Sequence, residues 1–117
     1  MLMRADKVLD EPVSSHGKER IIKLNREGIG FFKEKKYQRS VMAFTEAHSF
    51  FPRNIELNLN LVQALIKLLN DQTNDKNKEA WLTQAEACLK SIEHIPADHK
   101  KYQNYKRLMS EVTAQSH

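Results

Sequence analysis

The stretch that decides the fold is residues 24–52, LNREGIGFFKEKKYQRSVMAFTEAHSFFP. Gly28 stands three residues before Phe31 on a strongly helical background, where glycine costs about 1 kcal/mol of helix propensity. Close packing against a neighbouring helix is expected to offset this cost. Further along, Ser40, Phe44 and Ala47 recur at spacings of three and four, so small and large side chains share one helical stripe. The pattern predicts an antiparallel helical hairpin in which this stripe packs against Gly28.

The same spacing resembles a tetratricopeptide repeat, a helix-turn-helix unit of about 34 residues. The resemblance is carried by Leu24, Gly28, Phe31, Tyr37, Ser40, Phe44, Ala47 and Pro52. Leu24 stands where the family usually has tryptophan, and Ser40 where it usually has alanine. The resemblance implies stacked helical hairpins that present grooves to partners and carry out no reaction.

The composition of the whole chain also favours an all-α fold. Its 117 residues include only 3 Gly and 3 Pro, and helix-forming residue types dominate. The length suffices for one hydrophobic core. We expect a flexible N-terminal tail or linker over residues 1–15, which show no sustained periodicity, and one tetratricopeptide-like helical domain over residues 16–117.

Helical periodicity predicts five helices in that domain. The first four are expected at about residues 16–35, 37–50, 54–69 and 78–94. The fifth is expected to begin after Pro96, with Asp98 as its N-cap. A polar loop over residues 70–77 separates the third helix from the fourth, and we expect it to be mobile.

The third helix repeats the pattern of the first: Ile55 lies 34 residues after Ile21, which is the length of one tetratricopeptide unit. The sequence therefore predicts antiparallel helical hairpins stacked as about two tetratricopeptide units, with the fifth helix as a C-terminal cap. In the fourth helix, Trp81 is expected to be largely buried, on a stripe that continues through Ala85, Cys88 and Leu89.

Charge and cysteine content indicate the cellular compartment in which the protein is expected. The net charge is +4, and the single cysteine, Cys88, cannot build a disulfide framework. The first residues carry charges where a signal peptide would be apolar, and no run of about 18 apolar residues occurs. A cytoplasmic protein that does not contact a membrane is the expectation.

The sequence offers little for catalysis or for cofactors. The five histidines are scattered, whereas zinc sites need three or four ligands at tight spacing. Ser40, His48 and Glu46 do not suggest a catalytic triad, because Ser40 falls on the predicted packing face. Gly28 and Gly30 lie inside a helix rather than in a phosphate-binding loop. We expect a protein that is not an enzyme and that binds neither metal nor cofactor.

Nucleic acid is an alternative partner, since the last helix combines basic residues with Tyr102 and Tyr105. The ordinary alternative is a solvated face on which lysines alternate with acids. No recognition-helix motif or aromatic platform at strand spacing is present in the sequence, so nucleic acid is the weaker reading.

The sequence favours the interpretation that the partner is a protein or peptide. In the tetratricopeptide family, the first helix of each repeat lines a concave groove. The resemblance places in this groove Asn25, Ile29, Phe32, Lys33, Leu59, Gln63, Ile66 and Lys67. Its apolar floor and flanking lysines favour an amphipathic segment with acidic residues. Two alternatives stay open: the fifth helix covers the floor, or the hairpins pair with a second copy in a homodimer.

A less specific resemblance concerns the setting of the module. The leading Lys18-Glu19-Arg20 and the segment 58–64, NLNLVQA, look like tetratricopeptide modules that follow receiver domains in bacterial response regulators. This resemblance implies a scaffold in a bacterial signalling protein.

Overall fold

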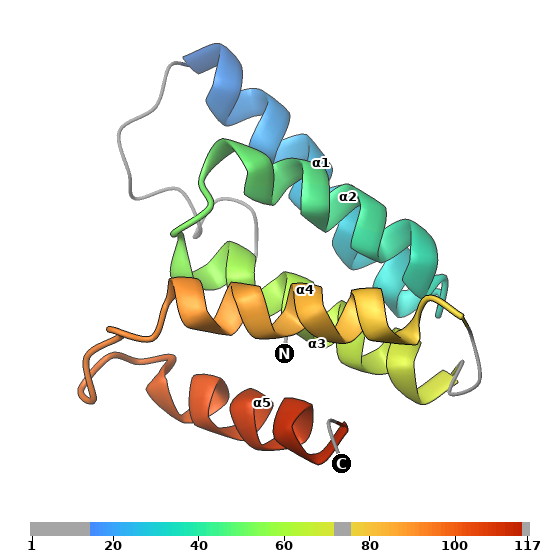
Figure 1. Ribbon diagram of the computed structural model, residues 1–117. Coiled ribbons are helices and arrows are strands. Elements are labelled where there is room, and N and C mark those ends of the chain that lie inside the picture. The colour runs from blue at the N-terminus through green and yellow to red at the C-terminus, as the bar shows by residue number, and fades with distance from the viewer. Residues whose placement is uncertain (1–14, 72–75, 116–117) are drawn as a thin grey trace.

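A computed structural model describes residues 15–71 and 76–115. These residues form five α-helices, shown in Figure 1: α1 (Ser15–Lys33), α2 (Tyr37–Phe50), α3 (Ile55–Asp71), α4 (Lys78–Ser91) and α5 (Tyr102–Gln115). The prediction of an all-α fold is confirmed. No helix in the described ranges has both the length and the apolar character that crossing a membrane requires.

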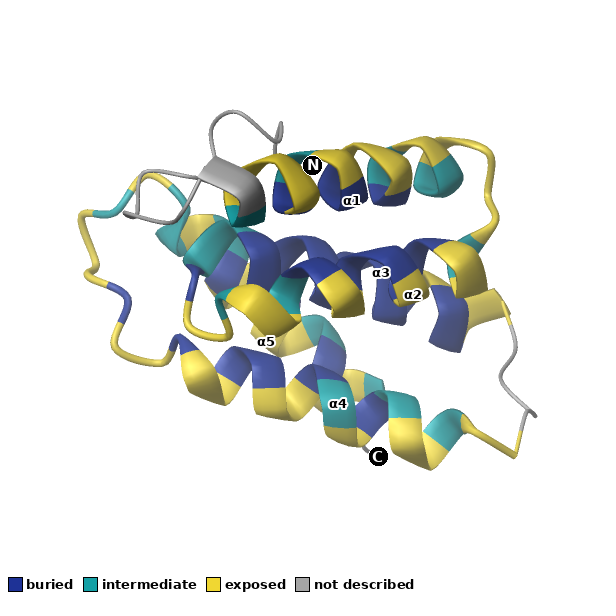
Figure 2. Cartoon of the chain, turned by 90° about the horizontal axis from the view of Figure 1, so that it is seen from above, coloured by how far each residue is buried: buried dark blue, intermediate teal, exposed yellow. Residues whose placement is uncertain are grey.

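The helices pack in chain order around α3. α1 packs on α2, α2 on α3, and α3 on α4, while α5 packs against both α3 and α4. Figure 1 shows α1 and α2 on one side of α3 and α4, and α5 on the other. Between Leu57 and Leu69 every residue of α3 is buried except Lys67 (Figure 2). A helix that is buried on nearly all sides takes such a central position in a domain.

The contact between α1 and α2 is as close as the sequence predicts. A Cβ atom added to Gly28 would lie 2.6 Å from Cδ1 of Phe44, a distance that real Cβ atoms do not tolerate. The Ser40 hydroxyl donates a hydrogen bond to the Gly28 carbonyl oxygen at 2.8 Å. Ser40 therefore combines small size with a polar contact that the usual alanine would lack.

Asparagines fix the position of α3. Asn60 Nδ2 donates to Asn25 Oδ1 at 2.9 Å, which joins α3 to α1 through two fully buried side chains. Asn54 caps the N-terminus of α3, because its Oδ1 accepts a hydrogen bond from the Leu57 amide at 3.0 Å. His48 Nε2 lies 2.9 Å from Asn58 Oδ1 and ties the end of α2 to the start of α3.

Several predicted boundaries require correction. α1 ends at Lys33 because Lys35 adopts a left-handed backbone with φ of 62°, and the Lys36 amide donates to the Phe31 carbonyl at 2.9 Å. α4 ends at Ser91 rather than near residue 94. α5 begins at Tyr102 rather than at Asp98, because residues 92–101 form a series of turns.

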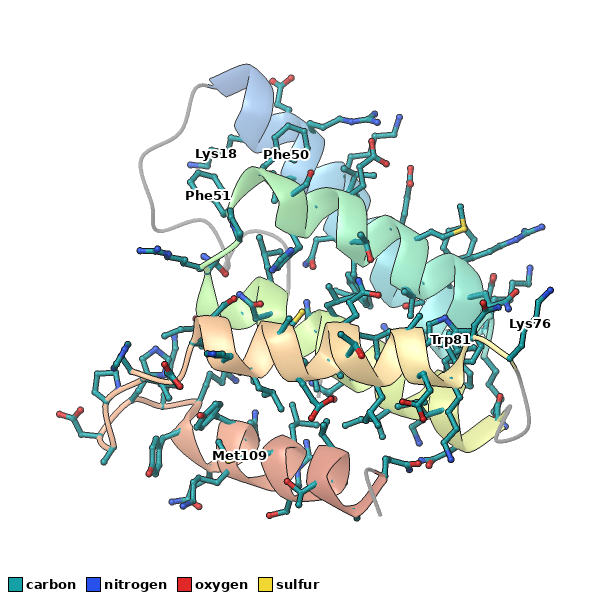
Figure 3. All side chains as sticks on the ribbon, in the orientation of Figure 1. Lys18, Phe50, Phe51, Lys76, Trp81 and Met109 are labelled. Carbon is teal, nitrogen blue, oxygen red and sulfur yellow. The ribbon has the colours of Figure 1, made fainter. Side chains whose placement is uncertain are left out.

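The predicted burial of Trp81 is confirmed in part. Trp81 is partly buried and packs against the core, and Figure 3 shows it near the end of α4 that follows Lys76. The adjacent Leu82 is more deeply buried. The buried residues of α4 are Leu82, Ala85, Cys88 and Leu89. The buried face therefore differs from the predicted stripe only at its first position, where Leu82 replaces Trp81.

Two predictions concern residues that the structure does not fully cover. Residues 1–14, which make up nearly all of the predicted tail, and residues 72–75 of the predicted loop lie outside the described ranges. Asn70 and Asp71 belong to α3 rather than to the loop. Assignment of the hairpins to two tetratricopeptide units stays a prediction.

Candidate functional site

The eight predicted groove residues divide by exposure into three groups. Asn25 and Leu59 are completely buried, so neither offers a surface to a partner, and their assignment to an open groove is corrected. Gln63 and Ile66 are buried but keep a small exposed fraction, 9% and 6% respectively. The accessible members of the set are Ile29 and Phe32, which are half-buried, and Lys33 and Lys67, which are exposed.

Half of the predicted residues meet in one pocket. This interhelical pocket has a volume of about 130 Å³ and lies where α1, α3 and α5 approach one another. Phe32 comes from the last turns of α1, and α3 contributes four residues that include Ile66 and Lys67. The full lining is Phe32, Gln63, Ile66, Lys67, Asn70, Arg107, Leu108 and Glu111.

The wall supplied by α5 was missed by sequence reasoning. Tyr105, Leu108 and Val112 bury one face of α5 against the core, and this places Arg107 at the pocket. At the far end of the helix, Gln115 Nε2 donates to Asn70 Oδ1 of α3 at 2.6 Å. The spacing of three and four residues along α5 indicates which face of the helix is buried. Arg107 precedes the buried Leu108, and this places it at the edge of that face.

The position of α5 bears on one alternative left open by the sequence, namely that the fifth helix covers the groove floor. α5 packs directly on α3, and the interhelical pocket lies between these two helices and Phe32 of α1. Pairing of the hairpins with a second copy stays a prediction.

The charges around the pocket are predominantly positive. Arg107 Nη1 lies 3.3 Å from Glu111 Oε1 in an exposed pair one helical turn apart, which contributes little to stability. In the described part of the chain, Lys33 and Lys67 have no ion-pair partner. Lys67 and the paired Arg107 thus line the pocket beside its apolar floor, whereas Lys33 follows the lining residue Phe32 on α1 and does not itself line the pocket.

The tyrosines of α5 do not form a stacking surface. Tyr105 is buried, and burial raises the pKa of its phenol, with smaller contributions from Glu93 and Tyr102. The half-buried Tyr102 ring has Lys106 Nζ at 5.9 Å from its centroid. Because only one ring of the pair is accessible, the predicted aromatic and basic combination offers a limited platform for bases.

Chemically reactive groups do not gather in the described ranges. No group of three or more histidine, cysteine, aspartate or glutamate side chains there is placed to hold a metal ion. Cys88 is buried, and this burial raises the pKa of its thiol to about 12. The reactive thiolate form is therefore scarce at neutral pH.

This burial gives a direct prediction for Cys88. The folded protein should react with Ellman's reagent near pH 8 only as fast as the α3–α4–α5 core opens, whereas the chain in denaturant should react at once. The comparison is a stopped-flow absorbance trace with and without denaturant. Equal rates would show that the thiol is accessible in the folded state.

Comparison with protein-family models, curated proteins and solved structures finds no match to this chain. The resemblance to tetratricopeptide repeats accordingly depends on the spacing within residues 24–52.

Proposed function

We propose that this protein is a non-enzymatic protein-interaction domain that binds an acidic amphipathic segment of a partner at the interhelical pocket. The observation that carries the proposal is the pocket itself. It joins an apolar floor, formed by Phe32, Ile66 and Leu108, to a positively charged edge that includes Lys67 and Arg107.

The size of the pocket limits what it takes. A volume of about 130 Å³ is close to the roughly 150 Å³ of an engineered protein cavity that accepts benzene. One apolar side chain of a partner, of leucine or phenylalanine size, is therefore the expected anchor. Such an anchor supplies affinity because its apolar surface is removed from water, as happens for buried side chains at the centre of other interfaces.

The positive charges of this domain favour acidic residues beside the anchor in the partner. Lys33 and Lys67 are exposed and free of ion pairs within the described residues, so they attract carboxylates without first breaking a pair. Acidic residues one turn before or after the anchor would meet the ammonium group of Lys67 at the pocket and that of Lys33 next to Phe32 in the sequence of α1. Exposed charges of this kind set orientation and association rate more than affinity.

The resemblance to tetratricopeptide modules supports the same class of function. By that resemblance, the domain serves as a cytoplasmic scaffold in a bacterial signalling protein of the response-regulator type. Binding at the pocket does not depend on that setting.

The test replaces both free lysines in Lys33→Glu/Lys67→Glu. The probe is a fluorescent amphipathic peptide of about 14 residues with leucines on one face and glutamates elsewhere. We expect binding to weaken by about two- to thirtyfold, because two exposed ion pairs contribute roughly 0.2–1 kcal/mol each. The residual binding should lose most of its dependence on salt between about 0.05 and about 0.5 M.

The control is Lys18→Glu/Lys23→Glu, which changes the net charge by the same amount. Both lysines are exposed on α1 and neither lines the pocket, and Lys18 lies about 22 Å along the helix from Lys33. Anisotropy titrations of both variants should separate local contacts from overall charge. Equal weakening in the two variants, or none in either, would contradict the proposed site.

A further inference from the structure

A second surface lies along the groove between α1 and α2. This outer seam is lined by Leu24, Glu27, Phe31, Arg39, Met42 and Glu46, among others, and encloses about 300 Å³. None of its residues lines the interhelical pocket, so the two surfaces are separate.

The outer seam has an exposed methionine at its centre. Met42 is 70% exposed although its neighbours Val41 and Ala43 are buried. Phe31 reaches the same groove from α1 and is half-buried. Met42 and Phe31 thus form a small apolar centre that is bordered by charged side chains, an arrangement that fits an interaction site.

The charges beside Met42 have both signs. Glu46 is already paired with Arg20. Glu27 on α1 and Arg39 on α2 have no ion-pair partner in the part of the chain that the structure describes, although both line the groove. The surface therefore presents one free carboxylate and one free guanidinium, on different helices, beside an apolar centre.

We propose that the outer seam binds a second copy of this chain in an isologous dimer. A two-fold axis near Met42 brings the two Met42 side chains together and places Glu27 of each copy opposite Arg39 of the other, so that the dimer contains two such ion pairs. A strongly acidic partner would meet Glu27, and a strongly basic one would meet Arg39. A surface of mixed sign matches itself better than it matches either.

The expected dimer is weak. The seam runs from Arg39 to Glu46 on α2, roughly 10 Å along the helix, and is two helices wide. This footprint is at the small end of specific interfaces, so we expect a dissociation constant of about 10–100 µM.

Sedimentation velocity from about 10 µM to about 1 mM tests the proposal. The wild-type chain should move from monomer to dimer over this range, and Met42→Glu should weaken the dimer at least about tenfold because it places two carboxylates at the axis. Met109→Glu is the control, since Met109 is also an exposed methionine (37%) but lies on α5, as Figure 3 shows.

A charge exchange tests the geometry itself. Glu27→Arg leaves two arginines at the seam, and Arg39→Glu leaves three glutamates there, of which Glu46 is paired with Arg20, so each variant alone should be monomeric. Mixed together, the two variants should form a heterodimer, which intact-complex mass spectrometry resolves after one chain is isotopically labelled. Circular dichroism should show both variants folded, because the two residues are exposed.

Three results would overturn the proposal. They are a wild-type chain that stays monomeric up to about 1 mM, a dimer that Met109→Glu disrupts as much as Met42→Glu does, and a mixture of charge variants that does not associate. The second result would indicate a head-to-tail contact between opposite ends of the molecule.

Discussion

Gly28→Leu should destabilise the domain by about 3 kcal/mol or more, which is a large fraction of the 5–15 kcal/mol that holds most domains folded. The reason is the Phe44 ring, which is 1% exposed and already lies against the Gly28 backbone. A leucine there has to push Phe44 away from α3 or separate α1 from α2. Urea denaturation followed by circular dichroism measures the loss.

Gly30 provides a matched control on the same helix. An added Cβ at Gly30 meets nothing within 4 Å. Gly30→Ala should therefore stabilise the domain by roughly 0.5–1 kcal/mol through helix propensity, whereas Gly28→Ala should destabilise it. If the two alanine variants shift the urea midpoint in the same direction by the same amount, the close approach of α1 and α2 is wrong.

Asn60→Leu is expected to cost about 1–3 kcal/mol, because it removes the hydrogen bond to the Asn25 carbonyl inside the core. Both side chains are completely buried, so water cannot replace the lost donor. The loss should appear as a lower urea midpoint with an unchanged slope.

The double variant Asn25→Leu/Asn60→Leu tests the same contact from the other side. Replacing both partners by apolar groups of similar size removes the unmatched carbonyl, so part of the lost stability should return. Additive losses in the double variant would mean that the two asparagines act independently. In that case the hydrogen bond would not be what joins α1 to α3.

The helical hairpin of α1 and α2 could be predicted from the sequence because its cause is local. Gly28 is costly inside a helix unless another helix approaches it, and the stripe on α2 supplies a large residue of the right spacing in Phe44. The end of α1 was less predictable. Lys35 adopts the left-handed conformation that glycine usually takes, so no residue type marks the turn.

The burial of polar residues could not be predicted as readily. Asn25 was assigned to a groove surface because it is polar, yet its partner lies 35 residues away and no local spacing shows the pair. One clue was present: Asn25 falls between Ile21 and Ile29 on the same helical face. On α4, Trp81 packs against the core in agreement with the sequence, but the adjacent Leu82, which the sequence did not single out, is the more deeply buried of the two.

The candidate site was predicted in part. Phe32, Gln63, Ile66 and Lys67 meet at the interhelical pocket, because α1 and α3 bring their C-terminal halves together there. Arg107 was absent from the prediction. Its place depends on how α5 folds back over α3, and this is set by long-range packing of Leu108 rather than by any motif near Arg107.

The most direct test of the proposed interaction site is a residue-resolved titration. Backbone amide resonances of isotopically labelled protein are followed while the acidic amphipathic peptide is added. We expect the largest shifts at Phe32, Ile66, Lys67 and Arg107, and we expect them to saturate together with one affinity. Shifts confined to the outer seam around Glu27 and Met42, or no saturable shifts at any residue, would contradict binding at the interhelical pocket.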